Sequence, residues 1–110
     1  MKPPAELGKP GRGLWAKVTR SLSFEDPREL IALRQSCLLE DDLVRLRAAL
    51  TDSALVVKGS TGQPVENPLL GAIRSAVALQ AKLLGSIAVP EQEQARAHAG
   101  RALAAQRWGN

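Results

Sequence analysis

The chain has 110 residues, a net charge of +4 and a pI near 9.8, and only 3% of its residues are aromatic. This length suits one domain with a thin core of Leu, Ala, Val and Ile, and the positive charge favours polyanionic partners. The single cysteine excludes an intrachain disulfide and a thiolate metal site, and no apolar run approaches the roughly 20 residues that cross a bilayer. We therefore expect a soluble, intracellular protein without a membrane partner.

The N-terminal residues 1–10 contain three prolines and a glycine, which predicts a flexible basic arm. A short helix is expected from about residue 11 to residue 22. Lys17 and Arg20 point away from its apolar face. That face is formed by Leu14, Val18 and Leu22. Trp15 lies beside it and is expected to pack against a neighbouring helix rather than stack on a base.

A long second helix is predicted from Pro27 to about Thr51, because Asp26 is a good N-cap and proline suits the first helical position. Its apolar residues fall into two strips, which implies two packing partners. One strip contains Leu39, Leu43, Leu46 and Leu50, and the other contains Leu30, Leu33, Cys37 and Val44. Cys37 is interpreted as a small buried apolar residue.

The acidic triplet Glu40, Asp41 and Asp42 lies in the middle of this helix. Consecutive helical residues point in different directions, so the triplet cannot converge on one metal ion by itself. We expect a solvated face on which Asp41 pairs with Arg45 one turn later.

Residues 55–66 predict a small β-hairpin, in which two extended runs flank the turn Gly59-Ser60-Thr61-Gly62. The turn lacks the pattern of a nucleotide-binding loop, so its glycines are interpreted as turn formers. Replacing Gly59 or Gly62 with Val should disrupt the turn if a positive backbone angle is needed there. Lys58 at the tip is a candidate contact for a polyanion.

A third helix is predicted to start at Asn67-Pro68 and to run to about Leu84, with Gly85 as its C-cap. It carries two apolar lines, one for the second helix and one free for a symmetry mate, so we infer a homo-oligomer. The first line is Leu69, Ala72, Ala76, Leu79 and Leu83, and the second is Leu70, Ile73, Val77, Ala81 and Leu84.

The last segment, residues 91–110, is rich in Ala and basic in its second half. Its arginines, Arg96, Arg101 and Arg107, do not form one helical stripe, which favours loose phosphate contacts. The single histidine, His98, has no catalytic partner at an evident spacing, and no zinc pattern is present. We expect neither an enzyme nor a bound cofactor.

The chain resembles the small terminase subunits of tailed bacteriophages, in particular the compact type of phages and prophages of high-GC bacteria. The resemblance covers about residues 7–108 and is most specific at residues 57–70, through Gly59, Gly62-Gln63 and Asn67-Pro68. The segments that carry it are LGKPGRGLWAKVT, DPRELIAL, LVVKGSTGQPVENPLL, the LLG that ends the third helix, and AAQRWGN.

The resemblance implies a non-enzymatic packaging factor in the cytoplasm of the bacterial host, whose partners are double-stranded viral DNA, the large terminase subunit and further copies of itself. The expected fold is mainly α, with two long antiparallel helices joined by a β-hairpin and assembled into a ring-like oligomer. Its parts are an arm (1–10), an oligomerisation core (11–90) and a basic tail (91–110). The first fifty residues contain no helix-turn-helix, so DNA-backbone contacts are expected.

The residues expected to contact DNA are Lys2, Lys9, Arg12, Lys58, Arg96, Arg101 and Arg107. Those expected at the oligomer interface are Leu39, Leu43, Leu46, Leu50, Leu69, Ile73, Ala76, Val77, Leu79 and Leu83. Two alternatives remain open from the sequence. One is a helical assembly adaptor without a nucleic-acid role, and the other is a small dimeric DNA-binding regulator.

Overall fold

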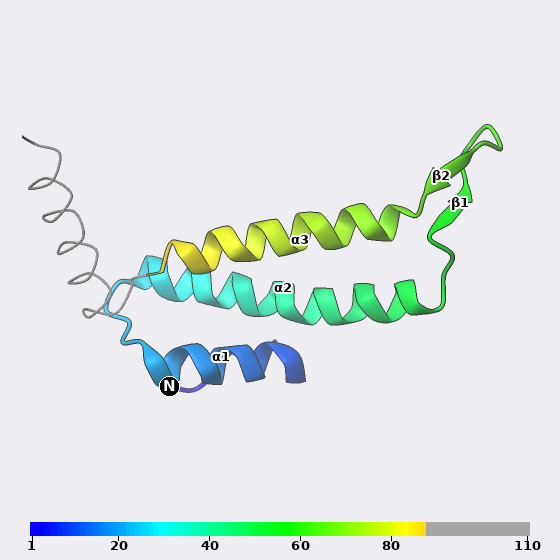
Figure 1. Ribbon diagram of the computed structural model, residues 1–110. Coiled ribbons are helices and arrows are strands. Elements are labelled where there is room, and N and C mark those ends of the chain that lie inside the picture. Colours follow the sequence, from blue (N-terminus) through cyan, green and yellow to red (C-terminus); the bar gives the residue numbers. More distant parts are fainter. Residues whose placement is uncertain (88–110) are drawn as a thin grey trace, which may run out of the picture.

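The computed structural model describes residues 1–87 and is mainly helical, with one small antiparallel sheet, as the sequence predicts. The elements are α1 (Lys9–Ser21), α2 (Pro27–Thr51), β1 (Val56–Lys58), β2 (Pro64–Glu66) and α3 (Pro68–Gly85). Helix α2 lies between α1 and α3, and α3 runs back along α2 in the opposite direction (Figure 1). The three helices therefore form one layer, with the hairpin beyond one end.

The two long helices begin where the sequence predicts. The Asp26 carboxylate accepts a hydrogen bond of 2.9 Å from the backbone N–H of Arg28, and the Asn67 side chain accepts one of 3.0 Å from that of Leu69. Asn67 also donates through its amide nitrogen to the Ala54 carbonyl, at 2.9 Å. The start of α3 is thus tied to the segment that leaves α2.

The hairpin pairs Val57 with Val65 at its centre. Gly62 has φ +84°, a left-handed conformation that glycine adopts without steric cost. The Gly62 N–H donates to the Gly59 carbonyl at 3.0 Å, and the Gly59 N–H donates to the Gln63 carbonyl at 2.7 Å. The glycines are turn formers, as expected.

The main core cluster joins all three helices. Its buried members are Leu7, Trp15, Leu33, Cys37 and Ile87. The expected packing role of Trp15 and the expected burial of Cys37 are both confirmed, since their exposed fractions are 5% and 0%. Helix α2 packs against α1 on one side and α3 on the other, so most residues of its two apolar strips are covered within the protomer, whereas Val44 stays exposed.

The N-terminal segment differs from the separate arm that the sequence predicts. Leu7 is 2% exposed in the core cluster, Glu6 forms an ion pair with Arg34, and α1 starts at Lys9 instead of near Gly11. Residues 1–8 therefore lie against the helices and not away from them. The physical reason is Leu7, whose apolar side chain is buried in the core cluster with Trp15 of α1, with residues of α2 and with Ile87.

Two further expectations are corrected. Arg45 pairs with Asp42 and not with Asp41, because Asp41 is used elsewhere. Helix α3 was expected to bury one of its two apolar lines against α2 and to leave the other free. Instead both lines are partly buried, since Ala76 of the first line and Ile73 of the second are both at least half-buried. Val77 and Leu79, one from each line, are exposed.

Candidate nucleic-acid interface

Helix α1 has an apolar face and a basic face. Gly11 and Trp15 are buried against the core, and Leu14 and Val18 are half-buried beside them. The opposite side carries four exposed cations within a sector of roughly 140°, given about 100° of rotation per residue. These four residues, which we call the α1 basic face, are Lys9, Arg12, Lys17 and Arg20.

The charge of the α1 basic face is not neutralised by the part of the chain that the structure describes. Helix α1 contains no acidic residue, and none of its four cations forms an ion pair with another residue of 1–87. By contrast, four other arginines are paired with carboxylates. They are Arg28, Arg34, Arg45 and Arg74. Lys2, Arg47, Lys58 and Lys82 are also exposed and outside these ion pairs, but α1 gathers four such cations on one face, where they can meet a phosphate backbone together.

The guanidinium group of Arg12 has one internal contact, a donated hydrogen bond of 2.6 Å to the Leu7 carbonyl. A carbonyl contact leaves the positive charge in place, and an arginine has five N–H donors, so further donors remain for an anion. This contact holds the guanidinium group near the N-terminal end of the face.

The orientation of α1 is set by Asp41, which lies in the middle of α2. One carboxylate oxygen accepts a hydrogen bond of 2.7 Å from the Gly8 N–H, and the other accepts one of 2.8 Å from the Gly11 N–H. Gly8 is the N-cap of α1 and has no side chain to satisfy these donors. A carboxylate from another helix therefore caps α1 and turns its basic face away from the core.

The close approach of α1 to α2 requires glycine at position 11. A Cβ there would lie 2.7 Å from the Cys37 carbonyl oxygen and 2.8 Å from a carboxylate oxygen of Asp41. A Cβ added at Gly13 would have no heavy atom within 4 Å, so it would meet no such contact. Gly11 therefore serves the α1–α2 contact, whereas Gly13 lies on the open side.

The structure brings together only some of the residues that the sequence selects for DNA contact. Lys9 and Arg12 lie on the α1 basic face, and Lys2 is exposed in the segment that precedes α1. Lys58 is also exposed, but it lies in the hairpin at the far end of α2 (Figure 1). Arg96, Arg101 and Arg107, together with His98, lie outside the described residues.

Sequence reasoning left Lys17 and Arg20 out of the set of DNA contacts. Their position opposite Leu14 and Val18 was visible from helical spacing, but the spacing alone did not show that Lys9 lies in the same helix. Once α1 begins at Lys9, the four cations share one side. The predicted helix, residues 11–22, already contained Arg12, Lys17 and Arg20, so helical spacing could have selected Lys17 and Arg20, and only Lys9 needed the earlier start.

The residues selected for an oligomer interface have different positions. Leu43 is 1% exposed and Ala76 is 9% exposed, so both side chains are used inside the protomer. Val77 and Leu79 remain exposed, at 41% and 48%. The other six are half-buried: Leu39, Leu46, Leu50, Leu69, Ile73 and Leu83.

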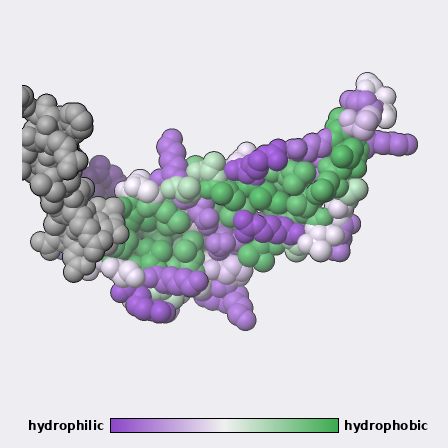
Figure 2. All heavy atoms as spheres, in the orientation of Figure 1, coloured by the Kyte–Doolittle hydropathy of each residue, from purple (hydrophilic) through white to green (hydrophobic). Residues whose placement is uncertain are grey.

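Several large apolar side chains outside that set are also exposed. Ile31 and Val44 on α2 are 59% and 45% exposed, and Leu55 and Val56 at the hairpin are 61% and 59% exposed. Figure 2 shows apolar surface along much of α2 and α3, interrupted by hydrophilic side chains. Surface of this kind favours contact with another protein chain.

Within residues 1–87, no group of three or more His, Cys, Asp and Glu side chains is placed to hold a metal ion. No helix in this part of the chain combines the length and the apolar character needed to cross a membrane.

Burial raises the pKa of the Cys37 thiol to about 11, and the nearby charges of Asp41 and Glu40 act in the same direction. Such a thiol is a poor nucleophile at neutral pH.

A scan against protein-family models, a search of curated proteins and a search of solved structures each find no match to this chain. The functional interpretation therefore depends on the α1 basic face, on the exposed apolar residues and on the sequence features described above.

Proposed function

We propose that this chain is a small terminase subunit, a DNA-binding oligomer that engages double-stranded viral DNA and delivers it to the large terminase subunit, the ATPase and nuclease of genome packaging. The observation that carries the proposal is the α1 basic face. It is independent of the resemblance, which is most specific at residues 57–70. The proposed setting is the cytoplasm of the bacterial host.

The α1 basic face suits contacts with the DNA backbone. Lysine and arginine neutralise phosphates regardless of base sequence, and their contacts make affinity depend steeply on salt. Trp15, which could stack on a base, is buried and donates through Nε1 to the Met1 carbonyl at 3.3 Å. Binding through α1 is therefore proposed to follow charge more than sequence.

Assembly into a ring is the second part of the proposal. Exposed Val77 and Leu79 on α3, and Ile31 on α2, supply apolar surface on the layer formed by the two long helices. Copies that stack through this surface around an axis would cover it and place many α1 basic faces on one assembly. Multiple faces would raise affinity for a long duplex without new contacts in each subunit.

The test measures assembly and DNA binding on the same sample. Native mass spectrometry should find a species much larger than a dimer, and a 60-base-pair duplex of arbitrary sequence should bind with an affinity that falls as salt rises. A dimer that saturates on a palindromic site would favour the regulator alternative. An oligomer that fails to bind DNA at low salt would favour the adaptor alternative and contradict the proposal.

A further inference from the structure

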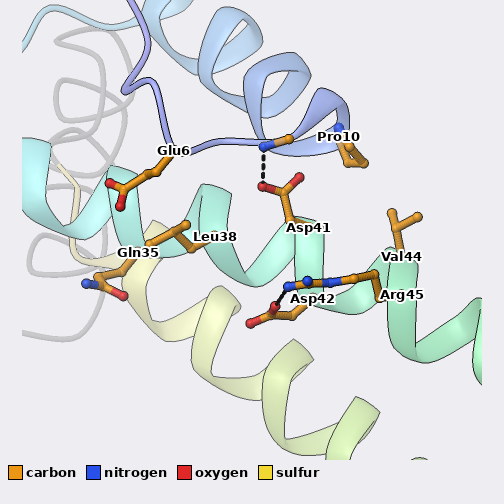
Figure 3. Close-up of a pocket in the computed structure, with 9 residues that line it drawn as sticks. Glu6, Pro10, Gln35, Leu38, Asp41, Asp42, Val44 and Arg45 are labelled. Atoms are coloured by element: carbon orange, nitrogen blue, oxygen red, sulfur yellow. Dashed lines mark hydrogen bonds and ion pairs between the residues drawn. The ribbon is translucent and has the colours of Figure 1, made fainter.

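A groove of about 600 Å³ lies between the start of α1 and the middle of α2. Figure 3 shows residues of the N-terminal segment on one side and residues of α2 on the other. Its apolar lining comes from Pro10, Leu38 and Val44. This volume falls within the roughly 300–1,000 Å³ of typical binding pockets.

The groove has an acidic rim. Glu6, Asp41 and Asp42 line it, whereas Arg45 is its only cationic lining residue. Glu6 pairs with Arg34, Asp42 pairs with Arg45, and Asp41 accepts hydrogen bonds from the N–H groups of Gly8 and Gly11. Each carboxylate can accept about four hydrogen bonds, so these contacts leave acceptors for an incoming guanidinium group. An apolar floor with an acidic rim fits a segment that is both apolar and basic.

We propose that the groove binds the basic tail of the same chain, residues 95–108. This segment, ARAHAGRALAAQRW, contains Arg96, Arg101 and Arg107, no acidic residue, and two large apolar side chains, Leu103 and Trp108. Its charge is opposite to that of the rim, and its apolar residues match the floor. The chain thus contains the kind of ligand that the groove is built to take.

The connection between tail and groove is short enough for binding within one chain. Ile87, the last described residue, is buried in the same cluster as Leu7, and Leu7 lies between the groove residues Glu6 and Gly8. The 14 residues 88–101 can span up to about 46 Å, more than the length of α2 at about 37 Å. A tether of this kind gives an effective concentration on the order of millimolar, so a weak contact is well populated.

Tail binding would regulate the proposed DNA interaction. An arginine held by the rim is not available to phosphate, so the duplex and the groove compete for the tail, while the α1 basic face stays open. Competition between the duplex and the groove depends on the proposed function, whereas binding of the tail in the groove does not.

The experiment places a photo-crosslinker in the groove of the full chain. Val44→Cys is labelled with benzophenone maleimide, and the buried native Cys37 is expected to stay unlabelled. After irradiation, mass spectrometry should locate crosslinks at residues 95–108 of the same chain. The matched control is Val77→Cys, because Val77 on α3 has nearly the same exposed fraction, 41% against 45%. It should give several-fold fewer tail crosslinks.

Two changes should lower the yield from Val44→Cys. They are Arg101→Glu, which reverses a tail charge, and high salt, which screens the pairing. Equal yields from both probes, crosslinks outside the tail, or crosslinks to a second chain would overturn the proposal. Added duplex should also reduce the yield. Crosslinks that persist at saturating duplex would contradict only the competition, and failure of the chain to bind duplex would count only against the proposed function.

Discussion

The carboxylate of Asp41, in the middle of α2, accepts a hydrogen bond of 2.8 Å from the backbone N–H of Gly11, in the first turn of α1. Its other oxygen accepts from Gly8 at 2.7 Å, so one side chain satisfies two donors at the start of a different helix. Anions are also favoured at helix N-termini by the helix dipole. This contact joins residues 30 positions apart and determines which side of α1 faces outward.

Replacement of Asp41 by Asn should destabilise the fold. The amide keeps the shape of the side chain, but it removes the charge and presents an NH2 group to one of the two N–H donors. Loss of hydrogen bonds to a charged group is expected to lower the free energy of unfolding by about 1.5–3 kcal/mol, measured by urea denaturation. Asp42→Asn is the control with the same charge change, because Asp42 makes only an exposed ion pair with Arg45. An equal loss in both variants would contradict the capping role of Asp41.

The two glycines of α1 should respond in opposite ways to alanine. Gly11→Ala places a methyl group 2.7 Å from the Cys37 carbonyl oxygen, which should cost about 1–3 kcal/mol because the helices must separate. Gly13→Ala meets no atom within 4 Å and should stabilise the protein by about 0.4–1 kcal/mol through helix propensity. Thermal unfolding of both variants checks the signs. Stabilisation by Gly11→Ala would show that α1 does not pack as described.

The hairpin turn should tolerate substitution poorly at Gly62. Its φ of +84° costs an L-residue about 1–2 kcal/mol, so Gly62→Ala should loosen the turn. Hydrogen exchange at the Gly59 amide, which donates to the Gln63 carbonyl, should then speed up. Gly71→Ala in α3 is the control, since it has neither a positive φ nor a heavy atom within 4 Å, and it should leave that exchange rate unchanged.

The α1 basic face should determine the salt dependence of DNA binding. The double variant Lys17→Gln/Arg20→Gln removes two cations from the face and should lower the slope of log K against log salt by up to about 1.8. Arg47→Gln/Lys82→Gln removes the same charge from exposed positions on α2 and α3 and should change the slope much less. Fluorescence anisotropy between 50 and 200 mM salt measures both. Identical slopes would place the DNA contact elsewhere.

Stability should fall at alkaline pH because of Cys37. Burial raises the pKa of this thiol from 9.0 to about 11, so the folded state holds the proton more tightly than the unfolded state does. The resulting stabilisation is fully present below pH 9 and is lost as the pH rises towards 11. Unfolding measurements between pH 8 and pH 10.5 should show a shallower decline for Cys37→Ala than for the natural chain. Parallel curves would mean that the thiol does not contribute.

Local rules were sufficient for much of the fold. Asp26-Pro27 and Asn67-Pro68 start α2 and α3 as predicted, since capping depends on residues within one turn of the helix. Gly62 forms the expected turn for the same reason. For the candidate interface, the sequence selected Lys9 and Arg12 and could have selected Lys17 and Arg20 by helical spacing, whereas the inclusion of Lys9 in α1 depends on the capping carboxylate from α2.

The sequence by itself determined the helical class, the starts of α2 and α3, the hairpin and the excess of positive charge, because each depends on composition or on neighbours in the chain. Only the tertiary structure decided that Asp41 is a cap and not one residue of a solvated face, that Leu7 anchors the N-terminal segment, and that Leu43 is buried within the protomer. These outcomes depend on which helices lie side by side. That packing places Asp41 beside Gly11, 30 positions away in the chain, and no local sequence pattern specifies this contact.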